Sequence, residues 1–448
     1  MQALPLWSAL FPIAESRPGC ASAALHIHLM LHKDDRSMKH QTSGGQARLT
    51  SSRRKLLSLA AGGALAASVP GCASPDRGPA VPSGQAQRAT VLGIPNERFY
   101  PASGSGALEQ EFIESFTRLA ATKGLKSPLD LPKLEALAIS GGGENGAFGA
   151  GLLNGWTEQG TRPEFEIVTG ISTGALTAPF AFLGPAYDAK LKSVYTELEP
   201  KRVLVPRFIT AALWDDAMAD NAPLYRTISE YLDDQMLAEI ARAYEGGRLL
   251  LIASTDLDAQ VPVIWNIGAI AKSGHPKAAD TIRRILLASA AIPGAFPPTM
   301  IDVTLDGKAY QEMHVDGGAF AQTFLYPAML TNNRRKRMQA RLPVLKLDAF
   351  VIRNGRLDAE WAHVQRKTLS IAGRAISTMT TAAGYNDVIK IYFNCVRDDI
   401  GFNLAYMGSD FNTPLPQPFD PAYMKALYDY GYQRAQRGYD WSKKPPLI

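Results

Sequence analysis

Apolar positions between residues 135 and 180 repeat one order: a short apolar strand, a turn framed by glycines, and a helix start rich in small residues. The first strand covers residues 136–140 and leads into the turn Gly141-Gly142-Gly143-Glu144-Asn145-Gly146. The second covers residues 165–169 and leads into Gly170-Ile171-Ser172-Thr173-Gly174. Two such units in succession predict a parallel β-α-β arrangement with a right-handed connection.

The rest of the chain alternates between predicted strands and predicted helices. Residues 186–245 have the spacing of amphipathic helices, and strands are predicted at 249–254, 261–267, 312–315, 344–352 and 389–393. Further helices are predicted at 108–121, 282–291 and 359–383, and a last one begins at Pro421 after the capping residue Asp420. This alternation indicates an α/β fold in which a largely parallel sheet is covered by helices on both faces.

The N-terminal region has the pattern of an export signal. Arg53 and Arg54 precede an apolar run of about fourteen residues, which is too short to span a bilayer and ends just before Cys72. The paired arginines resemble a twin-arginine signal. The cysteine after Gly71 resembles the lipobox of bacterial lipoproteins and predicts an exported protein anchored to a membrane of the cell envelope through lipidated Cys72. Pro70 departs from the lipobox, so cleavage without lipidation and a buried hydrophobic helix stay open as alternatives.

The pattern divides the chain into four parts. Residues 1–72 form the N-terminal segment and signal, and the late position of the signal indicates Met38 as the true start. Residues 73–106 are rich in Pro, Gly, Ser and Ala, which predicts a flexible tether. Residues 107–330 are the predicted catalytic domain, and residues 331–448 are a predicted α/β extension packed on it.

Composition narrows the possible functions. Apolar residues make up 46% of the chain and charged residues 20%, as in globular proteins. A net charge of +5 over 448 residues gives no case for nucleic-acid binding. The three cysteines lie far apart, and no cluster of His, Cys and carboxylates has metal-ligand spacing. We therefore predict neither a metal nor another cofactor.

The second glycine turn has the features of a nucleophile elbow. Ser172 lies between Gly170 and Gly174, and in this pattern a strained strand-to-helix turn lifts the serine hydroxyl clear of the sheet. The following helix favours negative charge that develops near its N-terminus. We therefore predict that Ser172 is a catalytic nucleophile.

Two further groups would complete an acyl-transfer site. The backbone N–H groups of residues 141–143 have no side chains beside them and are predicted to form the oxyanion hole. Asp316 ends a predicted strand and precedes Gly317 and Gly318, so its carboxylate could reach the elbow of a neighbouring strand. All of these candidates lie at carboxyl ends of strands, where the functional groups of open α/β sheets gather.

These residues allow two other interpretations, a dinucleotide-binding site and a Ser-Asp-His triad. Residues 141–146 also fit the dinucleotide pattern G-x-G-x-x-G, but the acidic residues Glu164 and Glu166 precede the second strand instead of ending it. A Ser-Asp-His triad would need a histidine after Asp316, and only His363 follows it. His363 has a helical context typical of packing, and His314 shares a strand face with Asp316, where a structural or substrate-side role is possible.

Together these motifs resemble the patatin-like phospholipases over residues 134–325. The resemblance rests on four motifs in the family's order, namely the glycine turn ending at Gly146, the serine turn, residues 287–293 with the following Phe296-Pro297-Pro298, and Asp316-Gly317-Gly318. It implies a Ser-Asp dyad in which Ser172 attacks a lipid acyl ester, Asp316 is the base, and Gly141, Gly142 and Gly143 stabilise the oxyanion. Asn145 departs from the family, which commonly has Arg or Lys there. The extension after residue 330 resembles that of some bacterial patatin-like lipoproteins.

The sequence thus predicts an exported, lipid-anchored serine acyl hydrolase that acts on phospholipid or related esters. The residues behind Ser172, among them Ala175, Leu176 and Phe180, are apolar and suit an acyl chain. Two alternatives stay open: a triad esterase of small soluble esters, and a catalytically weak lipoprotein that binds lipid, for which Asn145 is the one hint. The oligomeric state does not follow from the sequence.

Overall fold

The structure is a computed structural model that describes residues 77–104, 106–206, 216–217, 219–327 and 331–446. All of these residues belong to one compact unit, Gly71–Ile448. The predicted signal segment and Cys72 lie outside the described residues, so the export and lipidation predictions stay predictions. None of the described helices combines the length and the apolar character needed to cross a membrane.

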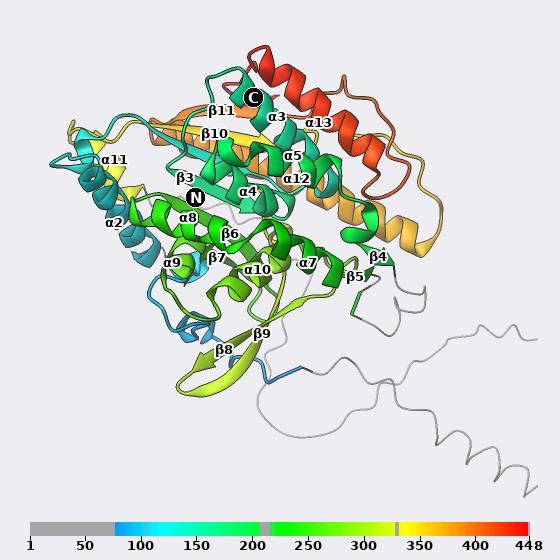
Figure 1. Cartoon of the computed structure of the whole chain (residues 1–448), viewed down its shortest axis with the longest axis horizontal. Coiled ribbons are helices and arrows are strands. Elements are labelled where there is room, and N and C mark those ends of the chain that lie inside the picture. The colour runs from blue at the N-terminus through cyan, green and yellow to red at the C-terminus, as the bar shows by residue number, and fades with distance from the viewer. Residues whose placement is uncertain (1–76, 105, 207–215, 218, 328–330, 447–448) are drawn as a thin grey trace, which may run out of the picture. The chain divides into compact units, whose positions relative to one another are not determined.

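A nine-stranded sheet, with the main order β1-β7-β6-β3-β2-β10-β11, forms the centre of the unit (Figure 1). Its parallel part consists of β2 (Leu134–Ile139), β3 (Ile167–Ile171), β6 (Leu249–Asp256), β10 (Leu347–Arg353) and β11 (Gly401–Tyr406). The antiparallel strands are β1 (Arg98–Phe99), β7 (Val261–Asn266), β8 (Thr299–Leu305) and β9 (Lys308–Asp316). The predicted α/β fold with a largely parallel sheet is confirmed.

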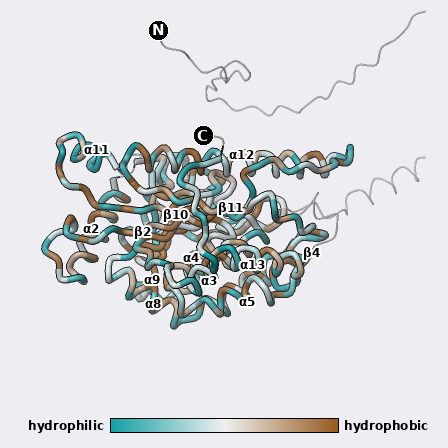
Figure 2. Tube along the Cα trace, turned by 90° about the horizontal axis from the view of Figure 1, so that it is seen from above, coloured by the Kyte–Doolittle hydropathy of each residue, from teal (hydrophilic) through white to brown (hydrophobic). Residues whose placement is uncertain are grey.

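Helices cover both faces of the sheet because successive strand residues point to opposite sides. In β2, Leu137 and Ile139 join one core cluster, whereas Ala136 and Ala138 join another. The first cluster takes side chains from α3 (Gly146–Glu158), α4 (Thr173–Leu183), α5 (Asp188–Thr196), α7 (Ala222–Tyr231), α8 (Asp234–Glu245), α10 (Ala278–Ser289) and α13 (Pro421–Gln436). The second takes them mainly from α2 (Gly106–Thr122) and α12 (Thr368–Arg397), and α9 (Ile267–Lys272) contributes to both clusters. Figure 2 shows hydrophobic strand segments between these layers.

Shorter elements complete the described chain. Strands β4 (Val205–Pro206) and β5 (Ala219–Asp220) pair with each other, and α11 (Asn332–Gln339) carries the basic run Arg334-Arg335-Lys336-Arg337. Short 3₁₀ helices occur at Ala86–Arg88, Pro101–Ser103, Pro128–Asp130, Gly143–Asn145, Pro185–Tyr187, Pro200–Arg202 and Gly317–Ala319.

Residues 77–104 are held against the body, so the prediction of a flexible tether is wrong for this stretch. Arg77 forms an ion pair with Asp258, and β1 pairs with β7 in the central sheet. Arg98 forms a buried ion pair with Glu312 at 2.5 Å. The high content of Pro, Gly, Ser and Ala predicted a tether because such residues are common in flexible linkers. Amino-acid composition carries no information on contacts with residues far away in the sequence.

The C-terminal part differs from its predicted elements at α12. Residues 359–367 are not helical, and the helix that begins at Thr368 continues through residues 389–393, which were predicted as a strand. Val388, Ile391 and Cys395 are buried on one side at helical spacing, so this apolar run belongs to a helix. Residues 331–446 also supply β10 and β11 to the same sheet as β2 and β3.

Candidate active site

Ser172 lies in the sharp turn between β3 and α4 and has φ 55° and ψ −127°. A positive φ is strained for a residue other than glycine, and such strain is concentrated at functional sites. The flanking glycines are required by close packing: a Cβ on Gly170 would lie 2.5 Å from the carbonyl oxygen of Gly174. A Cβ on Gly174 would lie 2.2 Å from the carbonyl oxygen of Ile139. The turn therefore has the form that the sequence predicted.

Strand register brings Asp316 to this turn. β3 pairs with one edge of β6 up to Ile171 opposite Ala253, and β7 occupies the other edge. β9 then pairs with β6 from Ser254 opposite Asp316, along the edge that β3 has left. The ends of β3 and β9 consequently meet, although they are far apart in sequence.

The last residue of α10 and the segment after it hold the backbones of both candidates. The Ser172 N–H donates to Ser289 Oγ at 3.0 Å, and Ser289 Oγ donates to the Ala253 carbonyl at 2.6 Å. The Asp316 N–H donates to the carbonyl of Ala291 at 2.9 Å. The segment is recognisable in the sequence as a motif, but the role of Ser289 was not predicted, because a buried serine has no distinctive local pattern.

Burial raises the pKa of Asp316 to about 7, while the Ser172 hydroxyl and the Gly318 N–H act in the opposite direction. The Gly318 N–H donates to Oδ1 at 2.6 Å, and the residue is only 4% exposed. Oδ2 has no partner at hydrogen-bond geometry among the described residues. The Ser172 hydroxyl is therefore close enough to this carboxylate to influence its pKa.

The glycine turn lies beside the serine, but its three N–H groups are not equivalent. A Cβ on Gly141 would lie 3.2 Å from Ser172 Cβ, yet the Gly141 N–H already donates to the Gln322 carbonyl at 2.9 Å. Within the described chain the N–H groups of Gly142 and Gly143 are paired with no acceptor. This pairing corrects the predicted donor set, because Gly141 has no free N–H to offer an oxyanion.

Arg353 at the end of β10 and Asn354 just after it support the glycine turn. The Asn354 side chain donates to the Ser140 carbonyl at 2.9 Å, and its backbone N–H donates to Ser140 Oγ at 2.8 Å. A Cβ on Gly142 would lie 2.1 Å from the Asn354 carbonyl oxygen, so only glycine fits there. Arg353 is buried and donates to the carbonyl of Gly141 at 3.3 Å. No local pattern marks Asn354 or Arg353 as functional, because they lie more than two hundred positions from the turn they support.

The departing residue Asn145 is tied to the C-terminal helix. Its Oδ1 accepts a hydrogen bond from the Tyr423 hydroxyl at 2.7 Å, and Tyr423 belongs to α13. Asn145 therefore fixes the 3₁₀ turn Gly143–Asn145 to a helix outside the predicted catalytic domain.

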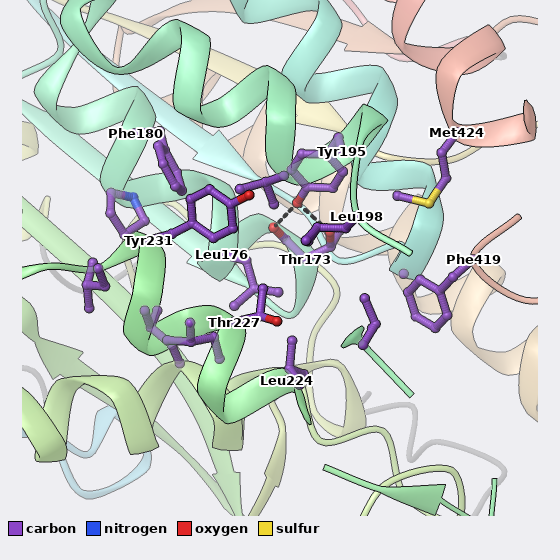
Figure 3. Close-up of a pocket in the computed structure, with 17 residues that line it drawn as sticks. Thr173, Leu176, Phe180, Tyr195, Leu198, Leu224, Thr227, Tyr231, Phe419 and Met424 are labelled. Carbon is purple, nitrogen blue, oxygen red and sulfur yellow. Dashed lines mark hydrogen bonds between the residues drawn. The ribbon is translucent and has the colours of Figure 1, made fainter. Parts of the chain in front are cut away.

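An apolar pocket of about 80 Å³ is lined by Thr173, the residue after Ser172, and by Gly143 of the glycine turn. Figure 3 shows its lining side chains. Gly143 and Thr173 are at its wall, and most other lining side chains are hydrophobic and come from α4, α5 and α7, including Leu176, Phe180, Val194, Leu224, Ile228 and Leu232. The Tyr195 hydroxyl is hydrogen-bonded to Thr173 Oγ1 at 2.7 Å and to Thr177 Oγ1 at 2.8 Å. These polar groups of the pocket wall therefore satisfy one another. Such a pocket suits an unbranched apolar chain.

The described histidines are not hydrogen-bonded to Ser172 or Asp316. His363 is exposed and precedes α12 in a non-helical stretch, contrary to its predicted helical context. His314 is fully buried, with Nδ1 2.9 Å from Ser254 Oγ and Nε2 3.1 Å from Glu312 Oε2. Within the described chain, the geometry thus places no histidine in hydrogen-bond contact with Ser172, and the one pair of Ser and His side chains, Ser254 with His314, does not include it.

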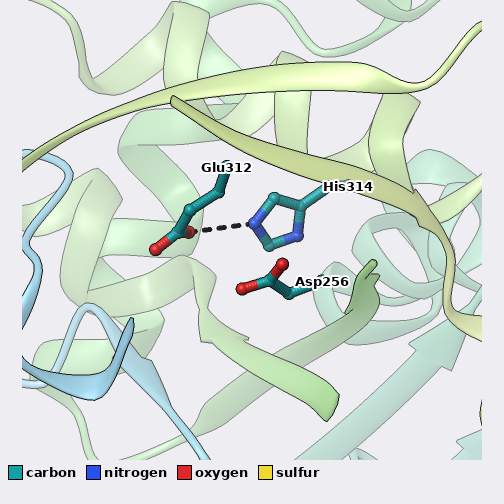
Figure 4. A group of neighbouring side chains, drawn as sticks. All are labelled: Asp256, Glu312 and His314. Carbon is teal, nitrogen blue, oxygen red and sulfur yellow. Dashed lines mark hydrogen bonds and ion pairs between the residues drawn. The ribbon is translucent and has the colours of Figure 1, made fainter. Parts of the chain in front are cut away.

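Asp256, Glu312 and His314 form a buried group whose possible metal-ligand atoms all lie within 4.8 Å of one another (Figure 4). Glu312, however, already binds the Arg98 guanidinium at 2.5 Å and faces His314 Nε2. A divalent cation would have to compete with that arginine for the same carboxylate, at a high electrostatic cost. We therefore describe this group as an ion network that supports β9 just before Asp316.

Residues 137–329 match the family model of the patatin-like phospholipases. This part of the chain is a patatin-like phospholipase domain. The patatin-like domain contains the glycine turn, the serine turn, residues 289–291 and Asp316, whereas Asn354 and Arg353 lie outside it. Its remaining motif glycines are set by packing: a Cβ on Gly146 would meet Thr173 Oγ1 at 2.2 Å, and one on Gly317 would meet the Ala253 carbonyl oxygen at 2.6 Å.

Comparison with curated proteins finds no matching sequence. Similar solved structures include VipD from Legionella pneumophila, with 14% identity, a TM-score of 0.34, and coverage of 68% of this chain and 66% of that chain. Human GIVD cytosolic phospholipase A2 has 11% identity, a TM-score of 0.33, and coverage of 77% and 65%. The chain thus spans just under two thirds of both structures, and the domain assignment rests on the family model.

Proposed function

We propose that this protein hydrolyses lipid acyl esters, with Ser172 as nucleophile and Asp316 as its base. One observation carries the proposal: a serine at positive φ faces a buried carboxylate whose pKa lies near 7, beside an apolar pocket. The match of residues 137–329 to the phospholipase family supports lipid acyl hydrolysis in general.

The proposed reaction proceeds in two acyl transfers. Ser172 Oγ attacks the ester carbonyl while its proton passes to Asp316, and the carbonyl oxygen becomes an oxyanion bound by the N–H groups of Gly142 and Gly143. Collapse of this intermediate expels the alcohol, which takes the proton from Asp316. Water then attacks the acyl-enzyme and gives a proton to Asp316. Collapse of the second tetrahedral intermediate breaks the bond to Ser172 Oγ, which takes that proton back from Asp316 as the fatty acid is released.

A carboxylate with an ordinary pKa would be a weak base for this task. Burial raises the pKa of Asp316 to about 7, which brings its proton affinity close to the pH at which it would work. The pocket at Gly143 and Thr173 would take the acyl chain, which supports phospholipids or related long-chain esters over small soluble ones.

The decisive test compares wild type with Ser172→Ala on two substrates, a short-chain chromogenic ester and a phospholipid dispersed in detergent. Loss of turnover on both substrates in a folded Ser172→Ala protein is expected. Turnover that survives this substitution would remove Ser172 from the mechanism. No turnover by wild type on either substrate would favour the alternative of a lipid-binding protein without catalysis.

Turnover should depend on pH through Asp316, which must be ionised to accept the proton. We expect kcat/KM for a soluble ester to rise about tenfold per pH unit up to a pH near 7 and then to level off. The measurement is a pH profile from acid to alkaline conditions, with circular dichroism at each pH as the control for folding. A profile that is flat through pH 7 would contradict the role of Asp316 as base.

We also propose that the protein is exported and anchored through lipidated Cys72. The support is the sequence pattern before Cys72, with Arg53 and Arg54 ahead of an apolar run. Cys72→Ser should shift the protein from the membrane to the soluble fraction or block its maturation. Mass spectrometry of the mature N-terminus is the direct check, and an unmodified terminus at another residue would exclude lipidation while leaving export open.

A further inference from the structure

The N-terminal half of α12 extends beyond the sheet with almost no contact to the rest of the described chain (Figures 1 and 2). Every residue from 375 to 379 is exposed, a stretch longer than one helical turn of 3.6 residues, so no side of the helix is covered there. We call residues 361–383, which join this half-helix to the stretch before it, the arm.

The arm exposes large apolar side chains. Trp361 is 89% exposed, and Ile371, Ile376 and Met379 are exposed by 51%, 56% and 68%. Further along α12, Phe393 and Val396 continue the apolar surface on the side opposite the buried Val388 and Cys395. A helix that is apolar on more than one side normally has each of those sides covered, so this one lacks a partner.

The charges of the arm are all of one sign. Arg366, Lys367 and Arg374 lie within it, and residues 361–386 include no Asp or Glu. The first acidic residue after the arm, Asp387, is turned inward and accepts the Gln322 N–H at 2.7 Å. The arm itself therefore carries only basic charges, and Glu360, which directly precedes it, is ion-paired with Arg356 at 2.7 Å.

The C-terminal end of the arm adjoins the carboxyl ends of the strands, where the candidate active site lies. Gln322, which binds Asp387, also accepts the Gly141 N–H through its carbonyl. A Cβ on Gly384, the residue after the arm, would lie 2.6 Å from the guanidinium carbon of Arg353 beside the glycine turn. A surface bound by the arm would consequently lie on the side of the molecule that carries the glycine turn.

We propose that the arm docks the protein onto an anionic lipid surface, with its apolar side chains in the interface and its basic groups at the lipid headgroups. Exposed Trp, aliphatic side chains and Lys or Arg are the combination that binds such interfaces. The helix is not of the kind that crosses a membrane, so it would lie on the surface. A symmetric dimer through the arm is disfavoured, because it would bring the same basic groups of two copies together.

The test uses residues 73–448, which include the complete described core but neither the signal nor Cys72. Ser172→Ala is added so that binding is measured without turnover. The arm variant is Ile376→Glu with Met379→Glu. The matched control is Leu129→Glu with Leu342→Glu, which makes the same charge change. These leucines are 43% and 49% exposed, and they precede β2 and β10 at the amino ends of the strands, opposite the candidate site.

Binding is measured by sedimentation with vesicles of phosphatidylcholine, with and without phosphatidylglycerol. We expect wild-type binding to need phosphatidylglycerol, the arm variant to bind about tenfold or more weakly, and the control to bind like wild type. Equal binding by the arm variant would overturn the proposal. A change in oligomeric state with unchanged vesicle binding would overturn it too, and would assign the arm to a protein partner.

The docking proposal rests on the proposed function only for its choice of a lipid surface, and the two can fail separately. With Ser172 restored, the arm variant should lose hydrolysis of vesicle phospholipid while keeping its turnover of a soluble ester. Absence of all turnover in wild type, together with arm-dependent vesicle binding, would refute the hydrolase and leave the docking surface. Arm-independent binding with normal turnover would do the reverse.

Discussion

Replacing Asp316 by Asn should lower turnover of a soluble ester by about 10²–10⁴-fold, the range in which a general base contributes to catalysis. The amide has the size and shape of the carboxylate, so the packing at the end of β9 should stay the same. It cannot accept the Ser172 proton, however, whereas the wild-type carboxylate has in Oδ2 an oxygen without a hydrogen-bond partner in the described chain. The measurement is kcat/KM for wild type and Asp316→Asn at pH 8, where the wild-type carboxylate is ionised.

Histidine variants separate the dyad from a triad. His363→Ala and His275→Ala should keep turnover close to wild type, because neither side chain is buried or bonded to the candidate pair. A folded His363→Ala protein with the same loss as Ser172→Ala would replace the dyad by a triad. Full activity in Asp316→Asn would exclude Asp316 as the base.

Asp316→Asn should also change the stability of the protein, and this change serves as the control for correct folding of the variant. The folded state binds the Asp316 proton more tightly than the unfolded state, since its pKa is about 7 against 3.8. Folding therefore takes up a proton between these values, and stability falls as the pH rises through this window. Three pKa units correspond to roughly 4 kcal/mol, part of which the neutral amide recovers.

Asp316→Asn should accordingly have a higher Tm than wild type at pH 8, and the difference should shrink toward pH 5. Thermal unfolding followed by circular dichroism at the two pH values is the check. A variant that is both inactive and less stable at pH 8 would mean that its activity was lost through misfolding.

The strand–turn–helix units around Gly141 and Ser172 could be predicted because each is specified by neighbouring residues. Glycines that leave no room for a Cβ and a serine at positive φ give a local pattern that distant contacts do not alter. The α12 region lacked such a pattern. Residues 389–393 form a short apolar run, which by periodicity alone fits a strand or a buried helix.

The groups that support the site come from distant parts of the chain and could not be predicted. Asn354 binds Ser140 across 214 positions, and Arg98 binds Glu312 across 214 as well. The choice of oxyanion donors also depends on a distant residue. The sequence allowed all three glycines, and only the register that places Gln322 beside the turn shows that the Gly141 N–H is already bonded.

The oxyanion hole is best tested at Gly143. Its φ is 57° and no atom lies within 4 Å of a Cβ placed there, so a larger side chain meets backbone strain but no clash. Gly142 is unsuitable, because any side chain would collide with Asn354. Valine is strongly disfavoured at positive φ, so Gly143→Val should turn the N–H away from the reacting oxygen and lower kcat by about 10²–10³-fold, as does loss of one such donor in other acyl-transfer enzymes.

A matched control separates this effect from general backbone strain. Gly124 has φ 68° and equally open surroundings, but it follows α2, far in sequence from the glycine turn. Gly124→Val should carry a similar stability cost with normal kcat, whereas Gly143→Val should lose kcat with little change in KM. Comparable kcat values in the two folded variants would show that the Gly143 N–H does not stabilise the oxyanion, and the donors would have to come from elsewhere.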